Sequence, residues 1–318
     1  MRLLFYCADN FQLLDLSGPA DVFAIANILS EVEHFTMQYV SEFGGRLRSN
    51  SGVEVETSSI NDVIVDERDV LFVINGLDVE RLPSPAVVRF LDEAHDRASS
   101  VCTICTGLFI LAAALRHMPY KATTHWRYFD VLRSKFPNIE LHPNAPFVND
   151  GKLWSSAGIS TAIDMSLHLL EQHCGRRLAQ QVTMAMVLPN RRRQNDAQLS
   201  FHLLLQFECS DTKWENLLHW IQENIATPLD TEKMASFMAM SPRNFTRRCK
   251  QEFDITPKKL VDRIRIELAN SLLQETAYSL SYIANRCGYG REENMKRAFL
   301  KGKGMTPFAL RRLVRGSS

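Results

Sequence analysis

The sequence lacks the features that mark membrane and secreted proteins. Of its 318 residues, 45% are hydrophobic and 23% are charged, an ordinary balance for a globular protein, and no apolar run reaches the roughly 18 residues that predict a membrane span. Asp9 and Asp15 interrupt the apolar N-terminus, and no small-residue cleavage site follows it. We therefore expect no signal peptide and no membrane contact.

The chain also has little that would hold a cofactor. Its 7 cysteines are scattered and odd in number, which favours reduced thiols in a cytoplasmic protein over a disulfide framework. It has no phosphate-binding glycine motif and no histidines and cysteines at the spacing of a zinc site. We expect neither a cofactor nor a metal.

The net charge of +1 conceals two halves of opposite sign. Residues 212–318 contain 19 Lys and Arg against 11 Asp and Glu, a net charge of +8, and residues 1–211 contain 18 against 25, a net charge of −7. A basic half indicates a polyanionic partner. Two solvated surfaces that differ by chance would give the same counts, so the motifs must decide.

Strands and helices alternate along the first half. Such alternation is typical of an α/β domain with a doubly wound, mostly parallel, flavodoxin-like sheet. We expect the first helix to begin at Gly18-Pro19, with Asp21 in its first turn. The expected strands are 2–7, 35–41, 51–58, 69–75 and 100–104, and the expected helices are 18–30, 84–98, 107–115, 159–173 and 176–187.

The second half is entirely helical. We expect a domain at 1–188, a linker at 189–212 in which Arg191–Arg193 are solvated, and an all-α domain at 213–318. Its seven expected helices are 214–225, 231–238, 242–252, 257–274, 279–286, 291–301 and 307–314.

An internal repeat runs through this helical half. Ala235 matches Ala284 at an offset of 49, and Arg247 matches Arg297 at an offset of 50. Each copy has the pattern of a helix, a short turn and a second helix, which predicts two helix-turn-helix units. One such pattern also fits an ordinary basic helical bundle, but two copies make that interpretation weak.

The second helix of each copy has two faces. One face is apolar, with Phe245, Cys249 and Phe253 in the first copy and Met295, Ala298 and Phe299 in the second. The other face carries Arg, Asn and Glu, which can read base edges in a major groove. The candidate DNA-binding residues are Arg243, Asn244, Arg247, Lys250, Arg291, Glu292, Asn294, Lys296 and Arg297. Helix 257–274, about 27 Å long, would separate the two units for binding to one face of a duplex.

The helical half resembles a known family. Residues 263–312 keep Ala269, Ile283-Ala284, Gly288-Tyr289 and Arg297-Ala298-Phe299, followed by Gly304–Pro307. This pattern is similar to the AraC/XylS-type DNA-binding domain. The resemblance implies a sequence-specific transcription regulator that binds double-stranded promoter DNA and works with RNA polymerase.

A sharp strand-to-helix turn at Cys105-Thr106-Gly107 marks the first half. This is the geometry of a nucleophile elbow, where the helix N-terminus would lower the pKa of the thiol. His125 follows about 20 residues later, after a short strand, and Asp15 supplies a carboxylate near the end of another strand. Ligands bind beyond the carboxyl ends of strands in such sheets, so we expect a ligand pocket there.

The elbow and two further segments resemble the PfpI-like, class I glutamine-amidotransferase-like superfamily. The segments LDLSGPADVF and SSAGISTAIDMSLHLLEQHCG are similar to GlxA-type regulators, in which this fold is fused to an AraC-type domain. The resemblance implies a homodimerising domain that binds a small nitrogenous effector, and an activator of transcription. The expected pocket residues are Asp15, Gly76, Cys105, Thr106 and His125.

Catalysis is the alternative. The superfamily includes hydrolases, so Cys105 would make the chain a cysteine-dependent amidase with an accessory DNA-binding domain. However, Thr106 follows the elbow cysteine where the hydrolases commonly have His, and Leu77 stands where a second Gly is usual. We therefore expect no catalytic residue. An interaction module without a ligand is a third interpretation.

Overall fold

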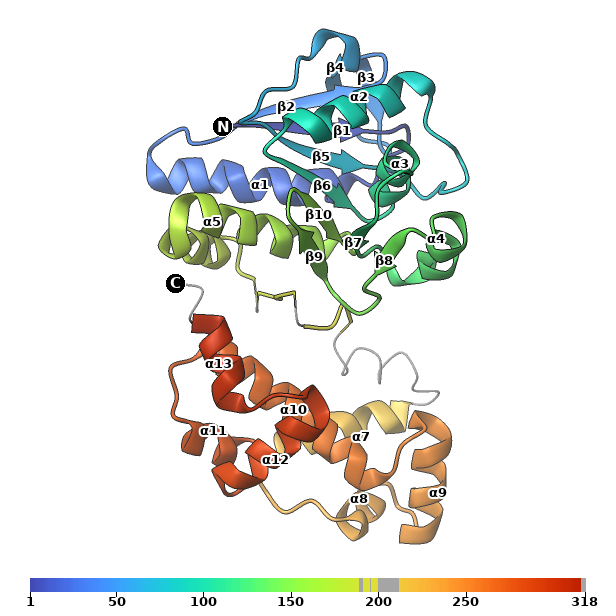
Figure 1. Cartoon of the computed structure of the whole chain (residues 1–318). Coiled ribbons are helices and arrows are strands. Elements are labelled where there is room, and N and C mark those ends of the chain that lie inside the picture. Colours follow the sequence, from blue (N-terminus) through green and yellow to red (C-terminus); the bar gives the residue numbers. More distant parts are fainter. Residues whose placement is uncertain (189–190, 195, 200–211, 316–318) are drawn as a thin grey trace. The chain divides into compact units, whose positions relative to one another are not determined.

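The computed structural model describes residues 1–188, 191–194, 196–199 and 212–315. The chain forms two compact units, Met1–Gln198 and Leu199–Ser318 (Figure 1). Each unit is described by itself below. The first unit is the expected α/β domain and the second is the expected helical domain.

An eight-stranded sheet forms the centre of the first unit. Its strands are parallel except at the two edges, where β3 and β9 run antiparallel to their neighbours. In spatial order they are β3 (Gly45–Arg48), β4 (Glu54–Ser59), β2 (Thr36–Ser41), β1 (Arg2–Cys7), β5 (Val70–Ile74), β6 (Ser100–Ile104), β10 (Leu153–Ser156) and β9 (Phe147–Asp150). Two short strands, β7 (Tyr120–Ala122) and β8 (Ile139–Leu141), pair separately. The sequence predicted the central strands and a short strand before His125, which is β7. It did not predict β3, β8, β9 or β10, which are only 3 or 4 residues long.

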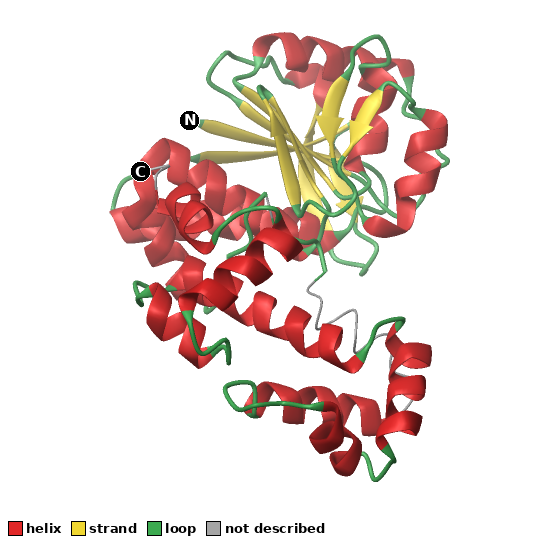
Figure 2. Ribbon diagram, turned by 60° about the horizontal axis from the view of Figure 1, so that its bottom comes forward, coloured by secondary structure: helices red, strands yellow, loops and turns green. Residues whose placement is uncertain are grey.

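Helices cover both faces of this sheet (Figures 1 and 2). Along β1, Leu3, Phe5 and Cys7 pack with α1 (Leu13–Ser30) and α5 (Ser160–Ala185). The alternate residues Leu4 and Tyr6 pack with α2 (Pro85–Arg97) and α3 (Gly107–Ala114) on the other face. This alternation is the two-residue period of a strand buried on both sides. The unit is completed by η1 (Ile60–Asp62), η2 (Trp126–Tyr128) and α4 (Phe129–Lys135).

The first helix begins earlier than the sequence predicted. It starts at Leu13, and Pro19 lies inside it. Proline removes only one backbone hydrogen bond there, and burial of the surrounding apolar residues outweighs that loss. By length and composition α1 is apolar enough to cross a membrane. It packs against the sheet as a core helix, with buried residues from Asp15 to Ala26.

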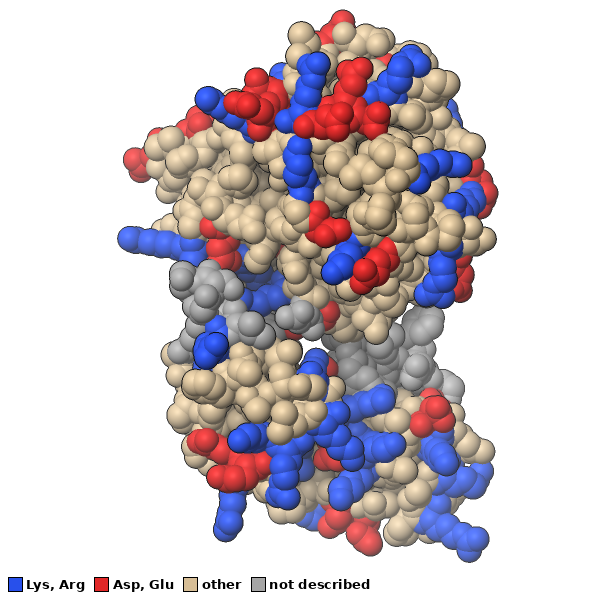
Figure 3. Space-filling view, in the orientation of Figure 1, with Lys and Arg blue, Asp and Glu red and all other residues tan. Residues whose placement is uncertain are grey.

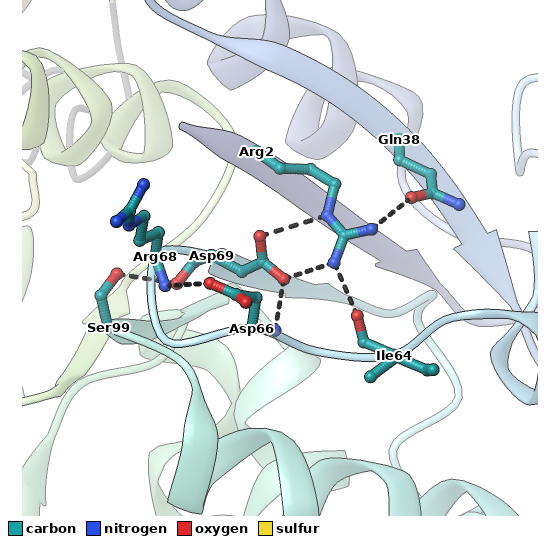
Figure 4. Close-up of polar contacts among 7 residues, drawn as sticks. All are labelled: Arg2, Gln38, Ile64, Asp66, Arg68, Asp69 and Ser99. Carbon is teal, nitrogen blue, oxygen red and sulfur yellow. Dashed lines mark hydrogen bonds and ion pairs between the residues drawn. The ribbon is translucent and has the colours of Figure 1, made fainter.

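A partly buried ion pair joins the amino ends of the central strands (Figure 4). The Arg2 guanidinium donates to both carboxylate oxygens of Asp69, at 3.1 and 2.5 Å, and also to the carbonyl of Ile64 at 2.6 Å. The hydrogen bond with Asp69 raises the pKa of Arg2. This pair joins β1 to the loop before β5 at the edge opposite the predicted pocket.

The end of the first unit differs from the expected solvated linker. Gly175, with φ +81°, interrupts α5 near the expected break between two helices. Arg191 then pairs with Glu171, and Arg192 pairs with Asp164, each at 2.7 Å. The interpretation of these arginines as solvated is wrong, because acidic side chains of α5 attract them.

The described part of the second unit, residues 212–315, contains the seven helices that the sequence predicted. They are α7 (Thr212–Glu223), α8 (Thr231–Phe237), α9 (Pro242–Phe253), α10 (Pro257–Glu275), α11 (Leu280–Arg286), α12 (Glu292–Lys303) and α13 (Pro307–Arg315). Asp230, Ser241, Thr256 and Ser279 cap helix N-termini with their side chains, a preferred use of these residue types. The pattern of caps explains why the helix bounds could be predicted closely.

Two small cores lie along α10, one for each helix-turn-helix unit. Helices α7–α9 pack on its first half and α11–α13 on its second, with Leu268 contacting both cores. Gly288 (φ +74°) lies directly against α7's C-terminal end, since an added Cβ would be 2.0 Å from the carbonyl oxygen of Ile225. Arg265 of α10 donates to the carbonyls of Ile225 and Thr227. These contacts fix the second helix-turn-helix copy against the end of the first α-helix of the helical unit.

We predict that Gly288→Ala destabilises the helical unit more than Gly290→Ala does. Both glycines have φ above +70°, but a Cβ at Gly290 would meet no atom within 4 Å. The left-handed backbone costs an alanine about 1–2 kcal/mol at either position. The clash with Ile225 should add about 1–3 kcal/mol at Gly288 alone. Urea unfolding of the full chain, followed by far-UV circular dichroism, measures the difference; equal losses would show that the close contact is unimportant.

Candidate functional site

Helix α9 presents the predicted DNA-binding face. Phe245, Cys249 and Phe253 are buried, as expected. Of the candidates on α9, Arg243, Arg247 and Lys250 are exposed and Asn244 is half-buried. The guanidinium of Arg247 is held from both sides, by Asn244 Oδ1 at 2.9 Å and by Gln251 Oε1 at 3.1 Å. Arg247 is therefore oriented away from the core before any partner binds.

Helix α12 repeats this arrangement one copy later. The guanidinium of Arg297 donates to Asn294 Oδ1 at 2.6 Å, and Asn294 donates to the carbonyl of Tyr289 at 2.9 Å. The Asn–Arg pair of α9 thus recurs at an offset of 50 residues. The repeat in the sequence preserves a side-chain contact and not only a helical pattern.

The pattern of buried residues in α12 shows which of its predicted DNA-binding residues face outward. Met295 and Phe299 are buried and Ala298 is half-buried. At about 100° per residue, Asn294 and Arg297 lie opposite the buried stripe, as do two exposed residues absent from the predicted set, Glu293 and Lys301. Arg291 is the N-cap of the helix, and Glu292 and Lys296 flank the outward face, all three exposed.

Basic side chains gather on the helical unit. Figure 3 shows a broad group of Lys and Arg over this unit on the face drawn, whereas acidic and basic side chains are mixed on the α/β unit. The helical half carries the net charge of +8 counted above. A surface of this kind attracts a phosphate backbone.

The predicted elbow is present at Cys105. Its φ of +55° is left-handed, which is rare for a residue with a side chain. Two glycines make room for the turn: a Cβ on Gly158 would lie 2.2 Å from Cys105 Cβ, and one on Gly107 would lie 2.0 Å from the carbonyl oxygen of Val73. The Cys105 N–H donates to Ser156 O at 3.0 Å.

Asp15 is the most unusual charged residue of the elbow. It is 0% exposed, and its Oδ1 accepts the backbone N–H of Ile159 at 2.7 Å. No hydrogen bond of ordinary geometry reaches Oδ2 within the described residues, although the Cys105 thiol lies close enough to lower the pKa of the carboxyl slightly. Burial outweighs both contacts and raises the pKa of Asp15 to about 7.

The expectation that Cys105 has a lowered pKa is wrong. Burial raises the pKa of this thiol well above its usual value, and the Asp15 carboxyl raises it further. Cys105 is 5% exposed, so desolvation of the thiolate outweighs the helix N-terminus. Cys105 is a neutral thiol at physiological pH, which does not favour a nucleophile.

The remaining predicted pocket residues, besides Asp15 and Cys105, are Gly76, Thr106 and His125. Thr106 is buried and donates to Gly76 O at 2.6 Å. His125 is half-buried, its Nδ1 accepts the backbone N–H of Arg127, and burial lowers its pKa. No hydrogen bond or ion pair of the described residues joins the His125 ring to Cys105 or Asp15.

Sequence reasoning missed a segment that returns to the elbow. Residues 191–194 and 196–198, called here the connecting arm, follow α5 and precede the second unit. Arg192 donates to Asp164, to Ser160 Oγ and to the carbonyl of Gln198. Gln198 in turn donates to Thr124 O at 2.9 Å, and Thr124 Oγ1 donates to Cys105 O at 2.7 Å. The only sequence signal was the run of arginines, which we interpreted as solvated.

Fold and site together define the class: a doubly wound α/β domain joined to a basic, tandem helix-turn-helix DNA-binding domain. The DJ-1/PfpI family model matches residues 1–172, and a helix-turn-helix domain model matches residues 234–313. The chain belongs to the DJ-1/PfpI family, and its second half is an AraC-type helix-turn-helix domain. Both expected resemblances are confirmed.

Two transcription regulators are similar to nearly the whole chain, and an enzyme is similar to part of it. The HTH-type transcriptional regulator GbdR of Pseudomonas aeruginosa is 23% identical over 95% of this chain and 82% of its own length. The regulator GlxA of Rhizobium meliloti is 23% identical over 98% and 95%. An isonitrile hydratase of Pseudomonas putida is 30% identical over 58% of this chain and 78% of its own length, so the family also includes an enzyme.

A solved structure shares the first unit. The crystal structure of an AraC family transcriptional regulator from Pseudomonas putida is 25% identical, with a TM-score of 0.51, and covers 58% of this chain and 98% of that one.

We predict that Asp15→Asn removes a pH dependence of stability. An aspartate whose pKa is raised to about 7 in the folded state binds more protons when folded than when unfolded between about pH 4 and 7. The native protein should therefore lose stability relative to Asp15→Asn as the pH rises through this window, by at most about 4 kcal/mol. Urea unfolding at pH 5 and pH 8 tests this, with exposed Asp21→Asn on the same helix as control. A pH-independent difference between native protein and Asp15→Asn would contradict it.

Proposed function

We propose that this protein is a sequence-specific transcription regulator, acting as an activator, that responds to a small nitrogenous metabolite. The observation that carries the proposal is the Asn–Arg pair repeated on the outward faces of α9 and α12. We assign sensing and dimerisation to residues 1–188 and DNA binding to residues 213–318. RNA polymerase is the further partner that an activator requires.

The repeated pair suits direct reading of base edges. An Arg guanidinium can bind guanine with two hydrogen bonds, and an Asn amide can bind adenine in the same way. Arg247 and Arg297 are each oriented by an Asn three residues earlier, which lowers the conformational cost of binding. Arg243 and Arg291 should also contribute to sequence-specific binding, and Lys250 supplies a contact to phosphate.

The test is a comparison of variants on DNA that the native protein has selected from a random library. Arg247→Ala should weaken binding by about 1–3 kcal/mol and relax the preference at one position. Arg248, exposed on the same helix but rotated by about 100°, is the matched control: Arg248→Ala should change the affinity without changing the preferred sequence. Equal sequence preference in native protein and Arg247→Ala, measured by fluorescence anisotropy, would refute the assignment of this face.

The effector site is proposed at the elbow. No hydrogen bond of ordinary geometry reaches the buried Asp15 Oδ2 within the described residues, and the donor near the carboxyl is the Cys105 thiol, which is a weak donor. A stronger donor would therefore be favourable there. A metabolite N–H is a suitable donor. Cys105 and Thr106 would contact the same ligand, and Gly76 and His125 would border it.

The connecting arm offers a route from this site to the DNA-binding half. Its hydrogen bonds run from Arg192 to Gln198 and through Thr124 to the carbonyl of Cys105. A ligand that displaces the elbow would therefore strain the arm, whose continuation along the chain is the second unit. Such a device couples binding to DNA affinity by favouring one arrangement of the arm.

Gln198→Ala should separate sensing from response. A panel of amino acids and quaternary amines is screened by thermal shift, since a ligand of the folded state raises the melting temperature. The hit should stabilise native protein and Gln198→Ala alike but alter DNA affinity only in the native protein. Gln194→Ala, in the same arm, is the control. If Gln198→Ala responds to the ligand on DNA like native protein, the arm is not the route.

A further inference from the structure

A cavity is lined by Gly76 but by none of the other residues expected at the elbow. It has a volume of about 500 Å³ and opens at the carboxyl ends of β1, β2 and β5. In the sheet, β1 lies between β2, the next strand in the sequence, and β5, a later one. The strand order therefore reverses at β1, and the cavity lies at this point. Open α/β sheets bind ligands at such points, and this volume is in the range of small-molecule sites.

Two buried polar side chains line this cavity without partners. Tyr6 is 4% exposed and Asn75 is 7% exposed. Among the described residues, neither the Tyr6 hydroxyl nor the Asn75 side-chain amide forms a hydrogen bond. Buried polar groups are otherwise nearly always bonded. Of the five residues expected at the elbow, Gly76 alone lines this cavity, so the two sites are distinct.

The charge left uncompensated in the cavity is negative. Its two arginines are already paired, Arg81 with Asp9 at 3.3 Å and Arg46 with Glu56 at 3.8 Å. Glu42 forms no ion pair with a described residue, and it lies near enough to the Tyr6 hydroxyl to act on it electrostatically.

Apolar groups complete the lining. Val87 and Ile110 belong to the core beneath the cavity. At the rim, Phe43 is 83% exposed and Leu82 is 63% exposed. An exposed aromatic ring beside a free carboxylate suits a ligand with a positive charge and an apolar body.

We propose that this cavity binds a small organic cation, a primary amine or guanidinium compound with an apolar portion. The charged head of this ligand pairs with Glu42 and donates to the side-chain oxygen of Asn75 and to the Tyr6 hydroxyl. Its apolar part lies against Val87 and Ile110, and Phe43 covers it. The site goes beyond the proposed effector site at the elbow and does not depend on it.

Calorimetric titration of the full chain with benzylamine tests this, with benzoate and benzyl alcohol as anionic and neutral probes of the same shape. Benzylamine should bind, and Glu42→Gln should weaken it by about tenfold or more, because a charge-assisted hydrogen bond is lost. Glu54→Gln, at an exposed carboxylate of β4, should bind like native protein. Asp15→Asn should also bind like native protein.

Each other outcome overturns the inference. If benzoate binds more tightly than benzylamine, the cavity binds anions, through Arg46 and Arg81. Loss of benzylamine binding in Asp15→Asn, with Glu42→Gln unaffected, would place the amine at the elbow and support the proposed function alone. Absence of benzylamine binding, or equal binding by Glu42→Gln, would show that the cavity is no cation site.

Discussion

The carboxyl edge of the sheet depends on the close contact between Cys105 and Gly158. Cys105 can keep its left-handed backbone only because its surroundings determine it, and Gly158 leaves the space that the turn needs. The backbone N–H of Cys105 then donates to Ser156 of β10, and the carbonyl of Cys105 accepts from the hydroxyl of Thr124. Because Ile159, the residue after Gly158, donates to Asp15, the same turn also positions the start of α1. One contact therefore joins four segments that are far apart in the sequence.

The loop at Gly76 separates two places where polar groups lack partners. No hydrogen bond of ordinary geometry reaches Asp15 Oδ2 on the side of α1, and the side chains of Tyr6 and Asn75 line the cavity on the side of α2 without a hydrogen bond to a described residue. At the amino edge of the sheet, Arg2 and Asp69 hydrogen-bond to each other (Figure 4). The polar groups without protein partners at the carboxyl edge lie where α/β proteins bind ligands.

The sequence predicted what local rules determine. Helix caps such as Ser241 and Ser279, and the apolar stripe of Phe245, Cys249 and Phe253, depend on residues within one or two turns, so the helical half followed the prediction closely. The elbow could also be predicted from neighbouring residues, because the strand, Cys105-Thr106-Gly107 and the helix follow each other directly in the sequence. The state of Cys105 could not: its pKa depends on burial beneath segments some fifty residues away, which outweighs the helix N-terminus. The contacts of Arg192 with Asp164 and of Gly288 with Ile225 were likewise invisible, because they join residues distant in the chain.

The construction of the helical unit limits how a signal can act on it. Helices α9 and α12, which carry the proposed DNA-binding residues, both pack on α10, and Gly288 and Arg265 join the second helix-turn-helix copy to the loop after α7. A change in the spacing of α9 and α12 would break these contacts of Gly288 and Arg265 with the backbone after α7. A ligand can contribute only the difference between its binding free energies for the two conformations. A shift in the connecting arm breaks a few hydrogen bonds around Arg192 and Gln198 instead. Regulation should therefore change how the two helices are presented to DNA as a rigid pair, and not the distance between them.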